Sequence, residues 1–271
     1  MPELPEVETT LRGIQPFIQH QVIAQLVFRR ANLRWPIPTT DLQRLVGQSI
    51  TAVKRRGKYL LLSTDLATII IHLGMSGRLR ILDKPAIADK HDHVDIIFDN
   101  GYLLRFTDPR RFGALLYSEA DPYQHPLLKQ LGVEPLSRQF CVDYLKRRLQ
   151  DKRLAIKSAL MDQCIVVGVG NIYATEALFI AGIHPLKSAR TLALVDLKRL
   201  LKATKSILRR AIWHGGSSLK DFLNSEGKPG YFSQKLQVYA RAGLPCVRCK
   251  SILASIRIGQ RSTVYCPHCQ H

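Results

Sequence analysis

The chain has 271 residues, which is enough for one large or two medium domains with a hydrophobic core each. Hydrophobic residues make up 46% and charged residues 23%, as in a typical soluble globular protein; there is neither an apolar run that could span a bilayer nor a secretion leader, so we expect a cytoplasmic protein. The net charge of +19 favours a polyanionic partner, and the lack of a basic amphipathic anchor makes nucleic acid a better fit than a membrane.

The first eight residues, Met1-Pro2-Glu3-Leu4-Pro5-Glu6-Val7-Glu8, could carry chemistry. If Met1 is removed, Pro2 presents a secondary amine beside the carboxylate of Glu3. An α-amino group has a pKa of roughly 7.7 to 8.0, so part of it is nucleophilic near neutral pH. Such an amine could attack an aldehyde-level carbon to give an iminium ion, with Glu3 moving the protons. The structural alternative is that proline and acidic residues simply suit the first turn of a helix.

The first half of the chain alternates between one helix and many strands. Apolar residues at helical spacing predict an amphipathic helix over residues 5–18, which would hold Pro2 in place. Short apolar runs separated by turn signals then predict an antiparallel β-sandwich, interrupted by a short helix over residues 41–46. The predicted strands are residues 22–28, 49–53, 59–62, 68–73, 79–82, 93–98, 103–106 and 114–117.

Three short segments between these strands hold candidate functional residues. In the basic turn predicted over residues 54–59, Lys58 follows a glycine and is the candidate, whereas the other charges resemble a solvated edge. Met75 and Phe112 lie in glycine-flanked loops, where they could act as wedges between base steps or simply border the core. The run His91-Asp92-His93 indicates polar contacts rather than a metal site, because no third soft ligand is near.

The second half is predicted to be mainly helical and carries most of the excess charge. Before Cys141 there are 18 basic and 14 acidic residues, and from there on 22 and 7. Glycines before Asn171 favour a phosphate-binding helix N-terminus, at which Asn171 could cap or donate. Helical periodicity covers residues 140–149, 154–162, 172–181 and 192–213. Strands in the first half and helices in the second predict an α+β fold. A proline-containing connector over residues 121–137 indicates a domain boundary, and the predicted domains are 1–125, 126–235 and 236–271.

The last four of the six cysteines form two Cys-x-x-Cys pairs. Their spacing is typical of a structural zinc site with four thiolate ligands, and a disulfide framework is disfavoured without a secretion signal. The module would be a β-hairpin that either enters a DNA groove or serves as a clip on a protein-binding tail. Cys141 and Cys164 are isolated and expected to be plain core or surface residues. The predicted ligands of one zinc ion are Cys246, Cys249, Cys266 and Cys269.

Six separated motifs occur in one order along the whole chain. They are Pro2-Glu3-Leu4-Pro5-Glu6-Val7-Glu8, Gly57-Lys58-Tyr59, His72-Leu73-Gly74-Met75-Ser76-Gly77, Asp108-Pro109-Arg110-Arg111-Phe112-Gly113, Gly168-Val169-Gly170-Asn171-Ile172-Tyr173 and the four terminal cysteines. In this arrangement the chain closely resembles the bacterial formamidopyrimidine-DNA glycosylases. The resemblance implies a DNA-repair enzyme of base excision repair that removes oxidised purines from duplex DNA and cuts the strand as an abasic-site lyase.

The resemblance also implies a role for four residues in the reaction. Pro2 resembles the nucleophile that attacks C1′ of the damaged nucleotide, and Glu3 the acid and base that assists base loss and ring opening. Lys58 resembles the lysine that acts as a general acid or phosphate contact during β-elimination. Arg261, on the zinc hairpin, resembles the arginine that assists δ-elimination.

Two sets of DNA contacts are implied as well. Met75, Arg110 and Phe112 match residues inserted through the duplex, with Arg110 facing the orphaned cytosine. The Gly- and Ser-rich residues 217–231 resemble a mobile loop that closes over the extruded base. The residues that match contacts to the DNA backbone are His91, Lys152 or Arg153, Lys157 and Asn171, the last in a helix–two-turn–helix element.

Two other functions fit parts of the sequence. The endonuclease VIII branch shares the architecture but prefers oxidised pyrimidines, and its N-terminus usually lacks the pattern Leu4-Pro5-Glu6-Val7 seen here. A zinc-ribbon DNA-binding protein without catalysis would explain the charge and the cysteines, but not Pro2-Glu3 or Lys58. We therefore expect a monomeric enzyme that acts on damaged double-stranded DNA at the nucleoid.

Overall fold

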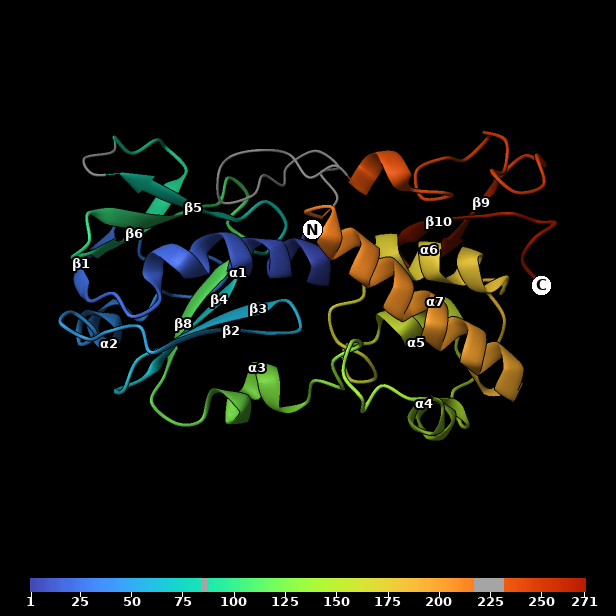
Figure 1. Ribbon diagram of the computed structural model, residues 1–271, viewed down its shortest axis with the longest axis horizontal. Helices are drawn as coiled ribbons and strands as arrows, with labels where there is room; N and C mark the ends of the chain where they lie inside the picture. The colour runs from blue at the N-terminus through green and yellow to red at the C-terminus, as the bar shows by residue number, and fades with distance from the viewer. Residues whose placement is uncertain (84–86, 217–231) are drawn as a thin grey trace. The chain divides into compact units, whose positions relative to one another are not determined.

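The computed structural model describes residues 1–83, 87–216 and 232–271, and it forms two compact units (Figure 1). Unit 1 comprises Met1–Gln130 and His214–Ser233, and unit 2 comprises Leu131–Trp213 and Gln234–His271. The predicted loop over residues 217–231 lies outside the described residues. The division into three domains stays a prediction, whereas the α+β class with antiparallel sheets, a helical second part and a terminal hairpin is confirmed.

Unit 1 is built around helix α1 (Leu4–Ile18). The helix begins with a capping box, in which Glu3 and Glu6 each accept the other's backbone N–H. Its apolar face is buried at helical spacing and packs against strands of both sheets, β2 and β3 of one and β5 and β7 of the other. Because α1 is anchored in this core, the residues that precede it have a fixed position.

Two four-stranded antiparallel sheets form the rest of unit 1, so the predicted sandwich is confirmed. The first sheet has the order β1-β6-β7-β5 and the second β2-β3-β4-β8. The strands are β1 (Ile23–Phe28), β2 (Ala52–Arg56), β3 (Tyr59–Ser63), β4 (Thr68–His72), β5 (Arg78–Asp83), β6 (Asp92–Phe98), β7 (Tyr102–Thr107) and β8 (Ala114–Ser118). The short helices of unit 1 are α2 (Thr39–Gln43), η1 (Pro122–Gln124) and α3 (Pro126–Lys129).

The predicted basic turn was wrong in its extent. Lys54, Arg55 and Arg56 belong to β2, which pairs with β3 down to the partners Arg56 and Tyr59. Only Gly57 and Lys58 are left for the turn. The predicted strand over residues 49–53 started too early, because Ser49 instead forms an isolated bridge with Val22.

A buried ion-pair network ties the first sheet together. Arg105 of β7 donates twice to Asp95 of β6, from Nε to Oδ1 and from Nη2 to Oδ2, both at 2.8 Å. Arg29 also donates to Asp95, at 2.6 Å. Burial alone would raise the pKa of Asp95, but the hydrogen bonds from Arg105 and Arg29 outweigh it and hold the pKa below its usual range.

We predict that Asp95→Asn lowers the free energy of unfolding by about 3 to 5 kcal/mol, because the buried guanidinium of Arg105 loses its two short bonds to a carboxylate and keeps the longer pair with Asp92, at 3.3 Å. A lowered pKa stabilises the fold above the unfolded-state pKa of about 4, and this contribution is lost as the pH falls through the folded-state value. Urea unfolding between pH 3 and 7 should therefore show a weaker pH dependence in the variant. Glu119→Gln, which breaks the exposed pair with Arg44, is the control and should leave the stability nearly unchanged.

Unit 2 consists of helices followed by a two-stranded hairpin. Its elements are α4 (Val142–Leu149), α5 (Ile156–Met161), α6 (Asn171–Ala181), η2 (Ala189–Thr191), α7 (Leu194–Trp213), β9 (Ala254–Ile258) and β10 (Arg261–Tyr265), and η3 (Phe232–Lys235) spans the boundary between the units. Helix α6 is buried nearly all round, packs against α7 and ends at Gly182, whose φ of 70° suits glycine. Within the described ranges, no helix combines the length and hydropathy needed to cross a bilayer.

Candidate functional site

The chain's N-terminus is positioned by the start of α1. Glu3 is the N-cap residue and only 3% exposed, and its backbone N–H donates to Oε2 of Glu6 at 2.9 Å. Pro2, directly before it, is buried, whereas Met1 is 45% exposed. Gly216 packs on the same cap, since a Cβ there would lie 3.2 Å from Oε1 of Glu6. Pro2 and Glu3 are thus held by helix capping as well as by chain connectivity.

An ion pair joins α1 to the turn that carries Lys58. Nε of Arg55 donates to Oε2 of Glu8 at 2.8 Å, and Nη1 of Arg55 donates to the carbonyl oxygen of Gly57 at 2.9 Å. Burial raises the pKa of Glu8, but the guanidiniums of Arg55 and Arg12 outweigh it, so that the pKa lies below its usual range. Arg55 therefore holds the Lys58 turn in a fixed relation to the helix behind Pro2.

His72, at the end of β4, is neutral at physiological pH. Burial, together with the positive charges of Lys58 and Arg34, lowers the pKa of His72 to about 4. The backbone N–H of Gly74 donates to Nδ1 at 3.1 Å, so the neutral ring carries its proton on Nε2. The imidazole can therefore donate a hydrogen bond to an anion without adding a charge to the site.

A buried aspartate connects the two loops that hold the predicted wedges. Asp108 accepts the hydroxyl of Ser76 at 2.6 Å through Oδ1 and the N–H of Gly113 at 2.7 Å through Oδ2. The N–H of Arg110 in turn donates to Oγ of Ser76 at 3.1 Å. Arg111, between these contacts, has a φ of 58°, a conformation that costs a non-glycine residue on the order of 1 kcal/mol and that the surrounding bonds sustain.

The same aspartate organises the run around His91. The backbone N–H of Asp108 donates to the carbonyl of His91 at 3.0 Å, and the His93 ring bonds to the carbonyl of Asp108 at 2.8 Å. Asp92 pairs with Arg80 and Arg105. The prediction of polar contacts is confirmed for Asp92 and His93, while the side chain of His91 is exposed.

A hollow of about 560 Å³ brings the N-terminus and the wedges together in unit 1. Met75 is 36% and Phe112 46% exposed, so neither is a core residue. The guanidinium of Arg110 lies 5.0 Å from the centre of the Phe112 ring. The residues that line the hollow are Met1, Leu33, Arg34, His72, Gly74, Met75, Arg111 and Phe112.

Unit 2 has its own cluster of predicted contact residues. Gly170 rather than Asn171 is the N-cap of α6, so of the two predicted roles of Asn171, to cap the helix or to donate a hydrogen bond, capping was wrong. Its side chain instead accepts a hydrogen bond from Lys157 at 2.5 Å and donates to the carbonyl of Ser262 at 3.2 Å. Lys157 is 1% exposed, in contrast to Lys152 and Arg153, which both lie on the surface.

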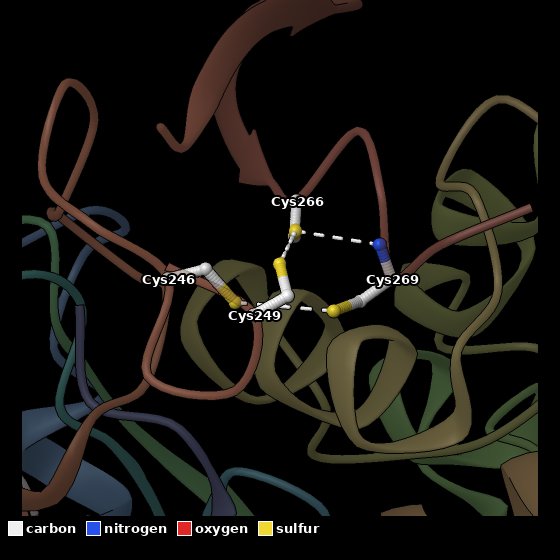
Figure 2. A group of neighbouring side chains, drawn as sticks. All are labelled: Cys246, Cys249, Cys266 and Cys269. Carbon is white, nitrogen blue, oxygen red and sulfur yellow. Dashed lines mark hydrogen bonds between the residues drawn. The ribbon is translucent and has the colours of Figure 1, made fainter. Parts of the chain in front are cut away.

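The four predicted metal ligands converge in unit 2 (Figure 2). Their sulfur atoms all lie within 4.8 Å of one another, with 3.4 Å between Cys249 and Cys266 and 4.0 Å between Cys246 and Cys269. A tetrahedral zinc ion with Zn–S bonds of about 2.3 Å needs sulfurs roughly 3.8 Å apart. Backbone N–H groups of Arg248 and Cys269 also point at ligand sulfurs. The cluster thus fits one structural zinc ion.

Comparison with known proteins gives the same assignment for every part of the chain. Sequence models of the formamidopyrimidine-DNA glycosylase N-terminal domain, of its H2TH domain and of the zinc finger found in FPG and IleRS match residues 1–115, 131–223 and 243–271. The formamidopyrimidine-DNA glycosylase of Shewanella amazonensis is 55% identical over 100% of this chain and 99% of its own length. The chain belongs to the formamidopyrimidine-DNA glycosylase family.

Other members of the family agree in sequence and in fold. The formamidopyrimidine-DNA glycosylase of Hydrogenovibrio crunogenus is 50% identical over 100% of this chain and 96% of its own length. The crystal structure of MutM (FPG) from Thermus thermophilus is 38% identical, with a TM-score of 0.87 over 99% of this chain and 98% of that one. A mutant FPG of Lactococcus lactis, in complex with a Fapy-dG containing DNA, is 33% identical, with a TM-score of 0.92 over 99% of both chains.

Sequence reasoning missed the residues that hold the family's motifs in place. Arg55 was interpreted as a solvated charge, yet it joins Glu8 to the Lys58 turn. Asp108 was noted only as part of a motif, although it is fully buried. Thr263, which is also buried, went unnoticed. Neither Asp108 nor Thr263 is flanked by apolar residues on both sides, so the local sequence gave no signal for these contacts.

Arg261 belongs to unit 2 and begins β10 directly after the hairpin turn. It is exposed, and it lines a hollow of about 290 Å³ between the hairpin turn and α5. Lys157 and Asp162 of that helix region line the hollow too. This setting allows an anion to approach Arg261 from outside. Its role in catalysis stays a prediction.

Proposed function

We propose that this protein is a bifunctional DNA glycosylase and abasic-site lyase, which removes 8-oxoguanine and formamidopyrimidines from duplex DNA. The observation that carries the proposal is the hollow in unit 1, in which the N-terminal residue meets Met75 and Phe112, with the neutral His72 beside them. A lesion turned out of the helix by the wedges would bring its sugar to the amine. Two relatives agree with this substrate class: the formamidopyrimidine-DNA glycosylase of Shewanella amazonensis, and the FPG mutant of Lactococcus lactis in complex with a Fapy-dG containing DNA.

The reaction begins once Met1 has been removed. The lone pair of the Pro2 nitrogen forms a bond to C1′, and the glycosidic bond breaks with its electrons leaving on the base, which takes up a proton. The nitrogen, now a protonated ammonium, gives its N–H proton to the Glu3 carboxylate and so regains a lone pair. That lone pair forms the C1′ iminium as the bond from C1′ to O4′ breaks, and Glu3 passes the proton on to O4′. The buried position of Glu3 beside Pro2 suits this proton transfer.

Strand cleavage follows because the iminium is an electron sink. Loss of a proton from C2′ expels the 3′ phosphate, with Lys58 as its acid or phosphate contact. Loss of a further proton along the conjugated system expels the 5′ phosphate, assisted by Arg261. Water then hydrolyses the iminium, which frees the sugar fragment and restores the amine. Arg55, which bonds to both Glu8 and the Gly57 carbonyl, keeps Lys58 in place for the first elimination.

We further propose that the remaining matched residues bind the duplex. Met75, Arg110 and Phe112 would fill the gap left by the extruded nucleotide, which offsets an extrusion cost of a few kcal/mol. The zinc ion, when bound, supplies the hairpin with a core and no reaction step. The backbone contacts would come from His91, Lys152 or Arg153, and Asn171.

A duplex with one abasic site tests the function directly. Incubation without added metal should cut the strand on both sides of the site, and borohydride should trap a covalent adduct. A duplex that is bound but left intact would instead indicate a non-catalytic DNA-binding protein. Preferential release of oxidised pyrimidines over 8-oxoguanine from matched duplexes would indicate the endonuclease VIII type.

We predict that Asp108→Asn slows release of 8-oxoguanine from a duplex by at least about tenfold, since an amide cannot accept from both Ser76 and Gly113 and the wedge loops lose a buried hydrogen bond. The rate of cleavage of an abasic duplex should fall much less, because extruding an abasic nucleotide costs less free energy than extruding one that carries a base. Single-turnover rates on the two duplexes give the comparison. Equal losses on both would mean that Asp108 does not act through base extrusion.

A further inference from the structure

We propose that Thr263 of the zinc hairpin is a positioning residue for DNA binding, acting through Lys157 on Asn171. The inference rests on the proposed function, since it takes Asn171 as a contact to the DNA backbone. In this proposal Lys157 acts on DNA binding indirectly, by holding Asn171. The zinc module gains a second function, which is to orient Asn171 at the start of helix α6. All the residues involved belong to unit 2.

Three elements meet at one buried ammonium group. Nζ of Lys157, on α5, donates to Oγ1 of Thr263 on β10 at 2.6 Å and to Oδ1 of Asn171 on α6 at 2.5 Å. Lys157 and Thr263 are each 1% exposed. A lysine withdrawn from water in this way needs acceptors to replace its hydration, and short charge-assisted hydrogen bonds supply them. The position of the ammonium therefore depends on both oxygens.

The ammonium decides which way the Asn171 amide faces. An ammonium group can only donate hydrogen bonds, so it must face the amide oxygen and not the NH2 group. Oδ1 of Asn171 therefore points toward Lys157, and the NH2 group points away from it. One N–H donates to the carbonyl of Ser262, and among the described residues no other acceptor is bonded to this group. Since an amide nitrogen has two N–H donors, the second remains for a phosphate oxygen. Asn171 is partly exposed, which allows such a contact.

The hairpin holds Thr263 in register for this task. Thr263 is buried and its neighbour Ser262 is exposed, while Val264 is buried on the opposite side of the strand. Arg261, two residues earlier, shares the face of Thr263 and lines a hollow together with Lys157. One strand thus carries Arg261, which is predicted to assist δ-elimination, and the hydroxyl that fixes Lys157. Binding of zinc would stabilise both at once.

Removal of the hydroxyl tests the proposal. Thr263→Val keeps the shape of the side chain and should weaken binding to a duplex with a tetrahydrofuran abasic analogue about tenfold, with one zinc per chain retained. Thr263→Ser should restore affinity to within about twofold of the wild type. Ser262→Ala, which removes an exposed hydroxyl from the same strand, is the control and should bind like the wild type. The rate of strand cleavage at saturating protein should change little in Thr263→Val.

A double-mutant cycle distinguishes positioning from general structure. In an Asn171→Ala background, Thr263→Val should weaken binding no further, because the group on which it acts is gone. A full second loss of affinity would overturn the proposal, as would wild-type affinity in Thr263→Val, a failure of Thr263→Ser to rescue, or loss of zinc from Thr263→Val. If the wild-type protein binds the analogue but never cleaves an abasic duplex, the proposed catalysis is wrong while the positioning role stands.

Discussion

When the Pro2 nitrogen is part of an amide bond, the rates of adduct formation and of strand cleavage are expected to fall roughly a thousandfold or more, as they do in enzymes whose nucleophile is removed. An N-terminal fusion that cannot be processed provides this form without changing a side chain. The amide nitrogen has no lone pair available for C1′, so neither the iminium nor the later eliminations can follow. Borohydride trapping on an abasic duplex measures the first step, and gel analysis of the strand measures the rest.

The matched control is the same fusion with a protease site that leaves Pro2 as the first residue after cleavage. It should recover the full rate, which would exclude an effect of the tag itself. Adduct formation by the blocked protein at the control rate would contradict the assignment and direct attention to another amine, Lys58 first. Mass measurement of the N-terminus in the naturally expressed protein should show that Met1 is absent.

The second large effect is expected from loss of the zinc site. Cys266→Ser should lower the zinc content and weaken duplex binding by about a hundredfold or more, because a small module whose core depends on a metal unfolds without it. The buried cluster around the ligands contains few apolar side chains, among them Val238, Leu253 and Val264, with Phe179 of α6. Metal analysis and fluorescence anisotropy with a labelled duplex give the two readouts.

Cys164→Ser is the control for this variant, since Cys164 is an exposed cysteine outside the metal cluster. It should retain one zinc per chain and wild-type affinity. If the wild-type protein folds and binds DNA with no zinc present, the claim that DNA binding needs the metal is wrong. Loss of zinc with unchanged affinity in Cys266→Ser would show instead that the hairpin is not part of the DNA-binding surface.

The two experiments are expected to affect different properties, because they change different units of the chain. The amide block removes a group of unit 1 and should leave affinity for an abasic analogue nearly unchanged. The zinc variant changes unit 2 and should act mainly on affinity. This division follows from the contacts, because Pro2 and Glu3 are held by α1, whereas Asn171 and Arg261 depend on α5, α6 and the hairpin.

The sequence by itself determined most of the secondary-structure elements and the metal ligands. Periodicity along one segment is a local property, and it was sufficient for α1, for most strands of the sandwich and for the long helix α7. The two Cys-x-x-Cys pairs identified the zinc site because each pair forms one turn with both sulfurs on the same side. The chemistry predicted for Pro2 and Glu3 also follows from adjacent residues alone, and it stays a prediction.

Only the tertiary structure decided which side chains hold these groups in place. Arg55 meets Glu8 across 47 positions, Ser76 meets Asp108 across 32, and Lys157 meets Thr263 across 106. A hydrogen bond is specific in distance and angle, but its donor and acceptor types occur throughout the chain, so the sequence does not reveal which pair will meet. Packing of α1 on two sheets, and of the hairpin on two helices, selects one partner for each. For the same reason Lys157, which the family resemblance led us to expect at the DNA backbone, is buried beneath Asn171.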